Sequence, residues 1–378
     1  MFPFRLQDSL FVRGIETDKI GRFMNIVPSK TNNRRAGGVG TLLLGLLMLG
    51  ACSKEPAMEQ PAPESEVVRL DFTAGIMADA VPSTRATIDG SVFPPRNDAY
   101  LFGMWVCKHE DDPSAFIPAM NDYENMRVAL YAVTTDEGEY RQQWEYTFDD
   151  KPHNVLHVKQ HTPVDIYAYY PRTQVAGDQS AFKPTAVPFQ SGSSDWMWAE
   201  PLQFTGEQLS GASVDVPLAF SHAMTCLEIR MKCLYAGSVD LTSITLTDKK
   251  GRIYTSGSMN LVNRTLILSD ENKSETLTIR PGTRLQPTDL KFHIIMPPVA
   301  GYEDGDFTLS FVFNGKPAET AFSIPNRMTN LSGEGEVTVS EFETGKRYIY
   351  SLTLDNTLRF TPVGVDNTWE TEEFELEL

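Results

Sequence analysis

Three histidines spaced four residues apart, His153, His157 and His161, are the first candidates for chemistry in this 378-residue chain. This spacing puts the imidazoles on one face of a helix or a strand, where they could ligate one metal ion. Pro152 and Pro163 flank the group, and the residues around His157 alternate between apolar and polar. A strand with a polar face explains this pattern better, so we expect no metal site.

Ser221 and His222 are adjacent and raise the question of nucleophilic catalysis. No G-x-S-x-G elbow surrounds them, and the sequence places no acid beside them. We therefore interpret His222 as a packed residue rather than a base. Carboxylates are numerous, but no spacing singles out a pair for glycoside hydrolysis. The sequence also has no Walker loop, dinucleotide fingerprint, H-E-x-x-H or EF-hand pattern, so we predict neither an enzyme nor a bound cofactor.

Trp196 and Trp198 lie in the run Asp195 to Ala199, inside a loop-rich section from Arg172 to Gly211. Exposed tryptophan rings could stack on sugars, whereas buried ones would fill one end of a β-sandwich. We favour the packing role, and the pair stays the candidate ligand site of an alternative, glycan-binding function.

Cys52 has the most specific predicted chemistry. The eleven residues from Thr41 to Ala51 are too few for a membrane-spanning helix, which needs about 20 residues, but they suit the apolar core of a secretory signal. Leu49 to Cys52 resembles the box at which bacterial lipoproteins are cut before a cysteine that is then acylated. We predict signal cleavage between Ala51 and Cys52 and a lipid anchor on Cys52, which would hold the chain at the outer membrane.

The predicted signal peptide, residues 1–51, is longer than the usual 15 to 30 residues or so. A start at Met24 would shorten this leader to 28 residues. Residues 52–66 follow as a lipidated linker, and from Ser53 to Glu66 they contain three prolines and four glutamates. This composition predicts a flexible, extended spacer.

The rest of the chain is acidic and contains few cysteines. Of 33 basic and 50 acidic residues, the leader holds 7 and 3, which leaves 26 and 47 and a net charge of about −21. Such a charge argues against nucleic acid as a partner. Cys107, Cys226 and Cys233 show no zinc spacing and no disulfide framework, and we expect buried thiols.

Short apolar runs with period two, separated by Gly, Pro and Asp, recur about every ten residues from Val67 onward. This pattern predicts an all-β chain with two β-sandwich domains in tandem, residues 67–205 and 206–378. Ser114 to Tyr123 has room for one short helix. The expected strands include Val67 to Thr73, Tyr100 to Cys107, Ala129 to Thr134, Val164 to Tyr170, Thr225 to Tyr235, Leu290 to Met296, Phe307 to Phe313 and Arg347 to Leu354.

In the closing run Glu372 to Leu378, acidic and apolar residues alternate strictly from Glu373 onward, with Phe374, Leu376 and Leu378 on one face. Such a strand either closes its own sheet or adds to the sheet edge of another molecule. Burial of each apolar side chain is worth roughly 1.5 to 3 kcal/mol before ordering costs, so both uses are energetically feasible.

Several short motifs together resemble the fimbrillin family of Bacteroidetes, the subunits of type V pili. They span Cys52 to the C-terminus in the order found in that family. Besides the lipoprotein box, they are Ser83 to Thr87, Asp165 to Pro171, Asp195 to Ala199, Val216 to Met224 and Val365 to Glu370.

The resemblance implies two transthyretin-like β-sandwich domains and assembly by strand exchange. An arginine-specific protease would cut between Arg85 and Ala86 and release the first strand, Val67 to Thr73; Arg69 and Arg96 are the other arginines open to cleavage. Thr371 to Leu378 would be the donor strand for the next subunit. We therefore expect a structural or adhesive pilus subunit precursor, exposed on the outer membrane and in fimbriae, with other subunits and a host protein or glycan as partners.

Overall fold

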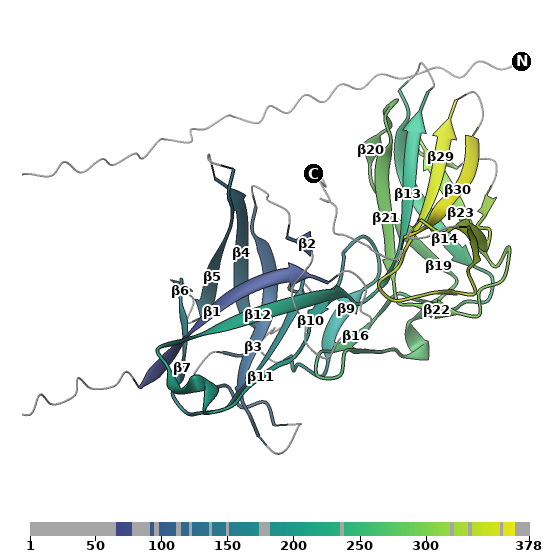
Figure 1. The fold of residues 1–378 in the computed structure, drawn as a ribbon. Coiled ribbons are helices and arrows are strands. Elements are labelled where there is room, and N and C mark those ends of the chain that lie inside the picture. Colours follow the sequence, from purple (N-terminus) through teal and green to yellow (C-terminus); the bar gives the residue numbers. More distant parts are fainter. Residues whose placement is uncertain are drawn as a thin grey trace, which may run out of the picture. The chain divides into compact units, whose positions relative to one another are not determined.

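The computed structural model of the chain describes residues 66–77, 91–93, 98–110, 115–120, 123–135, 138–148, 151–173, 182–234, 238–317, 321–331, 335–355 and 358–366. All of them belong to one unit of the chain, Ala62–Leu378. Apart from two short 3-10 helices, η2 (Gln208–Ser210) and η3 (Asp270–Asn272), the regular elements in these residues are β-strands (Figure 1). The prediction of an all-β chain is confirmed.

The first sheet has eleven strands in the order β2-β1-β12-β10-β8-β3-β4-β5-β6, with β7 paired to β1 and β11 paired to β8. Its strands are β1 (Val67–Ile76), β2 (Ser91–Val92), β3 (Tyr100–Lys108), β4 (Met126–Thr134), β5 (Tyr140–Phe148), β6 (Lys151–His153), β7 (Leu156–Lys159), β8 (Val164–Tyr170), β10 (Met197–Ala199), β11 (Leu202–Phe204) and β12 (Ser213–His222).

This sheet curls around a single hydrophobic core. Although β1 and β5 lie near opposite ends of the strand order, the ring of Phe72 on β1 is 6.0 Å from that of Trp144 and 5.6 Å from that of Tyr146 on β5. Phe102 on β3 and Phe220 on β12 are fully buried in the same cluster. The alternation read from the sequence therefore corresponds to one inward face on each strand.

A second core lies between two further sheets, as in a β-sandwich. One sheet has the order β21-β13-β29-β30, and the other has the order β19-β14-β23-β24 with β20 and β25 at its margins; both contribute buried side chains to the same cluster. The strands are β13 (Thr225–Cys233), β14 (Asp240–Asp248), β19 (Thr276–Ile279), β20 (Thr283–Arg284), β21 (Leu290–Met296), β23 (Phe307–Phe313), β24 (Lys316–Pro317), β25 (Phe322–Ser323), β29 (Arg347–Leu354) and β30 (Leu358–Asp366).

A third cluster joins strands from both halves of the chain. Strand β9 (Val187–Gln190) pairs with β16 (Ser256–Asn260), which pairs with β17 (Thr265–Ile267). Phe189 on β9 and Met259 on β16 are both buried in this cluster. The remaining strands form two-stranded pairs, β15 (Ile253–Tyr254) with β18 (Lys273–Ser274), β22 (Val299–Ala300) with β28 (Glu341–Phe342), and β26 (Arg327–Thr329) with β27 (Glu336–Thr338).

Strand β12 lies beyond residue 205, the expected end of the first sandwich, yet it belongs to the first sheet. It runs parallel to β1 from Ser213 to Phe220 and antiparallel to β10. Its inward side chains Val216, Leu218 and Phe220 lie in the first core. Because the strand shares both its sheet and its core with the first half, we propose that the domain boundary falls between His222 and Thr225.

The short helix expected between Ser114 and Tyr123 is wrong for the described residues 115–120, which contain no helix. Instead this segment pairs with the end of β3 through an isolated bridge between Cys107 and Pro118. The amide of Ala119 donates to the carbonyl of Val106 at 2.8 Å. Backbone hydrogen bonds with the end of β3 thus hold Ile117 to Ala119 beside that strand, and they take the place of a helix.

Candidate functional site

Strand β1 occupies a slot between partners on both sides (Figure 1). On one side it is parallel to β12 over eight residue pairs, from Arg69 with Ser213 to Ile76 with Phe220. On the other side its first residues pair with β7 and its last two pair with β2. The first strand of the described chain is therefore an inner strand of the sheet.

Alternate side chains of β1 point into the first core. Val68, Leu70, Phe72, Ala74 and Ile76 are each 6% exposed or less. Removal of β1 would uncover the apolar sites that these side chains fill, together with the backbone edge of β12. A strand with apolar residues at every second position could restore both kinds of contact.

One side chain joins β1 to β5 across the core opening. The side-chain amide of Gln142 on β5 accepts a hydrogen bond from Ala74 N at 2.9 Å and donates one to Ala74 O at 2.6 Å. It also donates to the hydroxyl of Tyr140 at 3.0 Å, and that hydroxyl donates to the carbonyl of Phe93 at 2.9 Å. Gln142 thus occupies the place of a neighbouring strand opposite Ala74.

Most of the predicted processing and exchange residues lie outside the described residues. Cys52 and the Ala51–Cys52 junction precede Glu66, the candidate cut between Arg85 and Ala86 lies in residues 78–90, and the donor residues Phe374, Leu376 and Leu378 follow Asp366. Strand β1 ends at Ile76, directly before the segment that contains Arg85.

Trp196 and Trp198 are packed rather than exposed. They are 5% and 6% exposed and belong to the third cluster, and the Trp196 indole donates to the carbonyl of Gln190 at 2.9 Å. Neither ring has a face open to a sugar in this structure.

A side chain of β8 in the same cluster, Tyr169, lies against Gly103, where an added Cβ would be 2.0 Å from the tyrosine ring.

The three spaced histidines take different positions. The His153 ring stacks on Phe148 with centroids 3.7 Å apart, His157 lies on β7, and His161 follows β7 with a positive φ of 56°. The described part of the chain contains no group of His, Cys, Asp or Glu residues suited to holding a metal ion.

Sequence reasoning missed the partner of His222. Its Nδ1 lies 2.8 Å from Oδ1 of Asp195, with side-chain exposures of 3% and 2%. The antiparallel pairing of β10 and β12 sets Met197 opposite His222, which brings Asp195 close to it. The buried position leaves no path for a substrate, so we interpret the pair as part of the packing between elements.

A second charged group surrounds Glu228, which is fully buried on β13. Arg347 donates to Glu228 at 3.2 Å, Arg230 donates to it at 2.5 Å, and His293 lies 3.5 Å away. Burial alone would raise the pKa of Glu228, but hydrogen bonds from His293 and Arg230 and the charges of Arg347 and Arg230 outweigh it and lower the pKa to about 2. Glu228 is therefore a structural anion.

The thiols are buried, as predicted for these cysteines. Cys107, Cys226 and Cys233 are all buried, and none of them forms a disulfide with another described residue. Burial, followed by the charge of Asp165, raises the pKa of Cys107 to about 12, and burial raises the pKa of Cys226 well above its usual range. Neither thiol is activated as a nucleophile.

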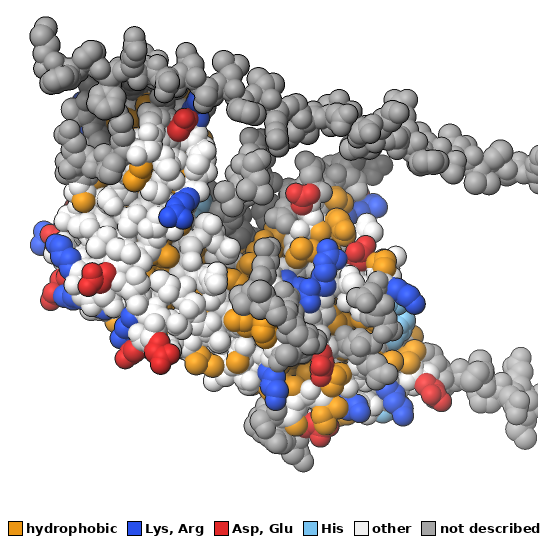
Figure 2. All heavy atoms as spheres, turned by 180° about the vertical axis from the view of Figure 1, so that it is seen from behind, with side chains coloured by type: hydrophobic (Ala, Val, Ile, Leu, Met, Phe, Trp, Pro, Cys, Tyr) orange, Lys and Arg blue, Asp and Glu red, His pale blue; other side chains and the backbone are white. Residues whose placement is uncertain are grey.

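The visible surface is mixed in character. On the face seen in Figure 2, acidic and basic side chains of the described residues are interspersed, and hydrophobic side chains gather in several places. Exposed apolar residues include Ile117, Met120 and Val155. Within the part of the chain that the structure describes, no helix has the length and apolar character that a membrane crossing needs.

Comparison with known proteins places the chain in a family. The family model described as fimbrillin-like matches residues 105–369, so the chain belongs to the fimbrillin-like family. This confirms the resemblance found in the sequence. A search of curated proteins found no match.

A solved structure supports the same fold. A protein from Bacteroides ovatus, whose name refers to cell adhesion, has 16% identity and a TM-score of 0.50, over 81% of this chain and 99% of that chain. A fimbrial protein from Bacteroides vulgatus has 13% identity and a TM-score of 0.37, over 80% of this chain and 99% of that chain. At these identities the first comparison supports the fold, and functional conclusions rest on the family and on the site.

Proposed function

We propose that the protein is a structural or adhesive subunit precursor of a type V fimbria that polymerises by strand exchange. The observation that carries this proposal is the position of β1: it is the first strand of the described chain, yet it fills an inner slot beside β12 with five inward side chains. Membership of the fimbrillin-like family supports the same role.

In this proposal an arginine-specific protease cuts after Arg85, and β1 then leaves. The C-terminal segment of another subunit enters the slot, with Phe374, Leu376 and Leu378 in place of inward residues of β1 such as Phe72. Each buried side chain would contribute roughly 1.5 to 3 kcal/mol. The intervening acidic residues of the donor would face outward, as Arg69, Asp71 and Thr73 do on β1.

A protease experiment tests the first step. The purified chain is treated with an arginine-specific protease, and the product is sequenced from its N-terminus. We expect a new terminus at Ala86 in the unaltered chain and in the control Arg96→Ala, and none in Arg85→Ala. Cleavage that persists unchanged in Arg85→Ala, or an uncut early loop, would contradict this step.

A truncation tests the second step. Removal of residues 372–378 should leave protease cleavage and folding intact but abolish polymers, as seen by electron microscopy and size-exclusion chromatography. The matched control replaces Glu373, Glu375 and Glu377 with Gln and keeps the apolar face; we expect it to polymerise. Polymers formed by the truncated chain would rule out this donor strand.

We further propose that the precursor is exported as a lipoprotein through Cys52 and reaches the cell surface at the outer membrane. The lipoprotein-like box around Cys52 supports this route. Metabolic labelling with a palmitate analogue should mark the unaltered chain and not Cys52→Ser. If both chains were labelled equally, Cys52 would not be the acylated residue.

A further inference from the structure

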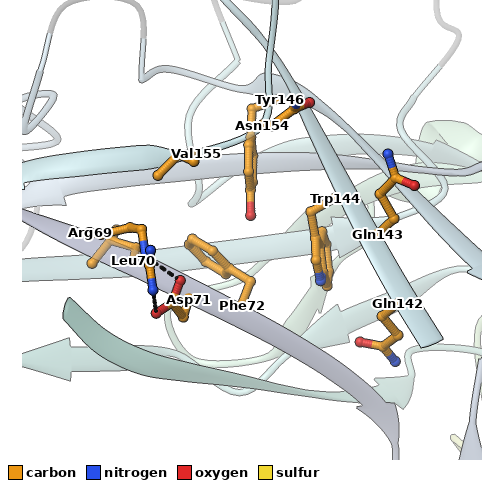
Figure 3. Close-up of a pocket in the computed structure, with 10 residues that line it drawn as sticks. All are labelled: Arg69, Leu70, Asp71, Phe72, Gln142, Gln143, Trp144, Tyr146, Asn154 and Val155. Atoms are coloured by element: carbon orange, nitrogen blue, oxygen red, sulfur yellow. Dashed lines mark hydrogen bonds and ion pairs between the residues drawn. The ribbon is translucent and has the colours of Figure 1, made fainter.

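A groove opens between β1 and β5, at the seam where the curled first sheet does not close (Figure 3). Pairing of β1 with β7 ends at Leu70, and its pairing with β2 begins at Gly75. Among the described residues, the groove therefore lies beside a stretch of β1 that no strand covers. Its volume is about 370 Å³, within the range of about 300 to 1,000 Å³ typical of small-molecule sites.

The floor of the groove is apolar and largely aromatic. Leu70 and Phe72 come from β1, and Trp144 and Tyr146 come from β5 (Figure 3). All four are buried, and the rings of Trp144 and Tyr146 are parallel to within 5° with centroids 6.4 Å apart. This floor could pack against the C–H face of a small ring.

One residue of the groove floor, Trp144, has a buried hydrogen-bond donor without an acceptor in the described part of the chain. The indole Nε1 of Trp144 is buried and has no hydrogen-bond partner among the described residues, and Trp144 is 8% exposed. A buried donor without an acceptor costs about 1 to 3 kcal/mol. The nitrogen is the blue atom of the Trp144 ring in Figure 3. A ligand oxygen that reached it would remove this cost.

The rim is polar, and its charges cancel. Arg69 and Asp71 form an ion pair at 2.7 Å, while Gln143 and Asn154 are exposed neutral amides. With the cation and the anion already paired, the groove offers no net charge to an ionic ligand. Amides that both donate and accept suit a ligand rich in hydroxyl groups.

We propose that the groove between β1 and β5 binds a neutral sugar residue. The sugar ring would pack on Phe72 and Trp144, one of its oxygens would accept from the Trp144 indole, and its remaining hydroxyls would bond Gln143 and Asn154. This site is separate from Trp196 and Trp198, which are buried in the third cluster.

The test uses the purified chain labelled with ¹⁵N in its tryptophan indoles. The indole ¹⁵N–H resonance of Trp144 is identified as the one that is lost in the Trp144→Phe variant. Glucose, galactose, mannose, N-acetylglucosamine and fucose are added one at a time at millimolar concentration. We expect at least one of them to move the Trp144 resonance in a saturable manner.

The double variant Gln143→Ala/Asn154→Ala should weaken that binding at least tenfold while the spectrum of the folded chain is retained. Asn263→Ala, an exposed amide in the turn between β16 and β17, is the matched control and should bind as the unaltered chain does.

Four results would overturn the proposal. They are a Trp144 resonance that no neutral sugar moves, a response only to anionic sugars such as N-acetylneuraminic acid, binding that persists in the double variant, and a response to a peptide of residues 371–378 but to no sugar. The last result would assign the groove to a protein strand. Because the test uses the uncut chain, its outcome is independent of whether subunits polymerise.

Discussion

The side-chain amide of Gln142 on β5 forms two hydrogen bonds with the backbone of Ala74 on β1, one to its N–H at 2.9 Å and one to its carbonyl at 2.6 Å. A glutamine side-chain amide has an acceptor oxygen beside an NH2 donor group, so it can pair with the N–H and the carbonyl of one strand residue as a neighbouring strand would. Gln142 therefore holds the first strand at a point where, among the described residues, neither β7 nor β2 pairs with it.

Loss of this link should loosen β1. We expect Gln142→Ala to lower the free energy of unfolding by about 1 to 3 kcal/mol, because two backbone groups lose their partners. Gln142→Glu keeps the acceptor but loses the donor and should lie in between. Chemical denaturation gives the free energies, and amide hydrogen exchange at Ala74 gives the local effect.

The control for this prediction is Gln143→Ala, an exposed neighbour on β5, which should change stability by less than about 0.5 kcal/mol. Equal effects at positions 142 and 143 would show that the double hydrogen bond contributes nothing to stability.

A covalent lock should keep β1 in its slot after cleavage. Arg69 on β1 and His157 on β7 are exposed antiparallel partners, so Arg69→Cys/His157→Cys offers a disulfide within one register pair. After protease treatment the oxidised variant should stay monomeric, and a reductant should restore polymers. The single Arg69→Cys variant controls for loss of the arginine. Polymers formed by the locked chain would show that β1 need not leave.

Acid should weaken the packing of β13 through Glu228, which lies on the face of β13 opposite Leu227 and Ile229 of the second core. Its folded pKa of about 2 lies below its ordinary value near 4.5, so the ionised form stabilises the fold. This contribution is complete above pH of about 4.5 and is lost as the pH falls towards 2, and it amounts to about 3 kcal/mol. Urea unfolding of the unaltered chain and of Glu228→Gln at pH 7 and at pH 3 follows its partial loss.

Glu228→Gln should be less stable than the unaltered chain at pH 7, and the difference should shrink at pH 3. The control Glu341→Gln removes an exposed carboxylate elsewhere in the second half and should leave the pH dependence unchanged. A parallel pH profile for Glu228→Gln and the unaltered chain would contradict the assignment of Glu228 as the structural anion.

The buried side chains of Trp196 and Trp198 should differ in stability contribution by one hydrogen bond. Trp196→Phe loses the bond from the indole to Gln190 O at 2.9 Å, a cost of about 1 kcal/mol beyond the change in packing. Trp198→Phe is the matched variant with similar burial, 6% against 5% exposed. Thermal unfolding should show the lower midpoint for Trp196→Phe; the reverse order would assign the larger polar role to Trp198.

Local patterns in the sequence predicted most strands but not their long-range partners. Alternation in Val67 to Thr73 identifies a strand, whereas its parallel pairing with β12 depends on residues far along the chain. For the same reason the sequence pattern did not indicate the contact between Asp195 and His222, which forms only because β10 and β12 are neighbours in the sheet. Gln142 looks like any exposed polar position on an alternating strand.

The sequence pattern did not predict strand β30, because a proline lies inside it. Pro362 lies inside Leu358 to Asp366, and proline normally argues against a strand interior. In the structure β30 is the last strand of its sheet, and a register shift near Pro362 moves its pairing from Tyr350 with Pro362 to Ile349 with Gly364. A bulge on an outer strand tolerates the missing amide, which local pattern reading does not anticipate.

The parallel pairing of β1 with β12 also has a consequence for how the chain folds. Arg69 meets Ser213, which lies 144 residues later, and contacts between such distant residues form late because a long loop must close first. We expect a folding intermediate in which the rest of the first sheet is formed and the edge of β12 is still bare. Cleavage in the proposed assembly route would return the subunit to that same intermediate, so polymerisation would complete a folding step with a strand from another chain.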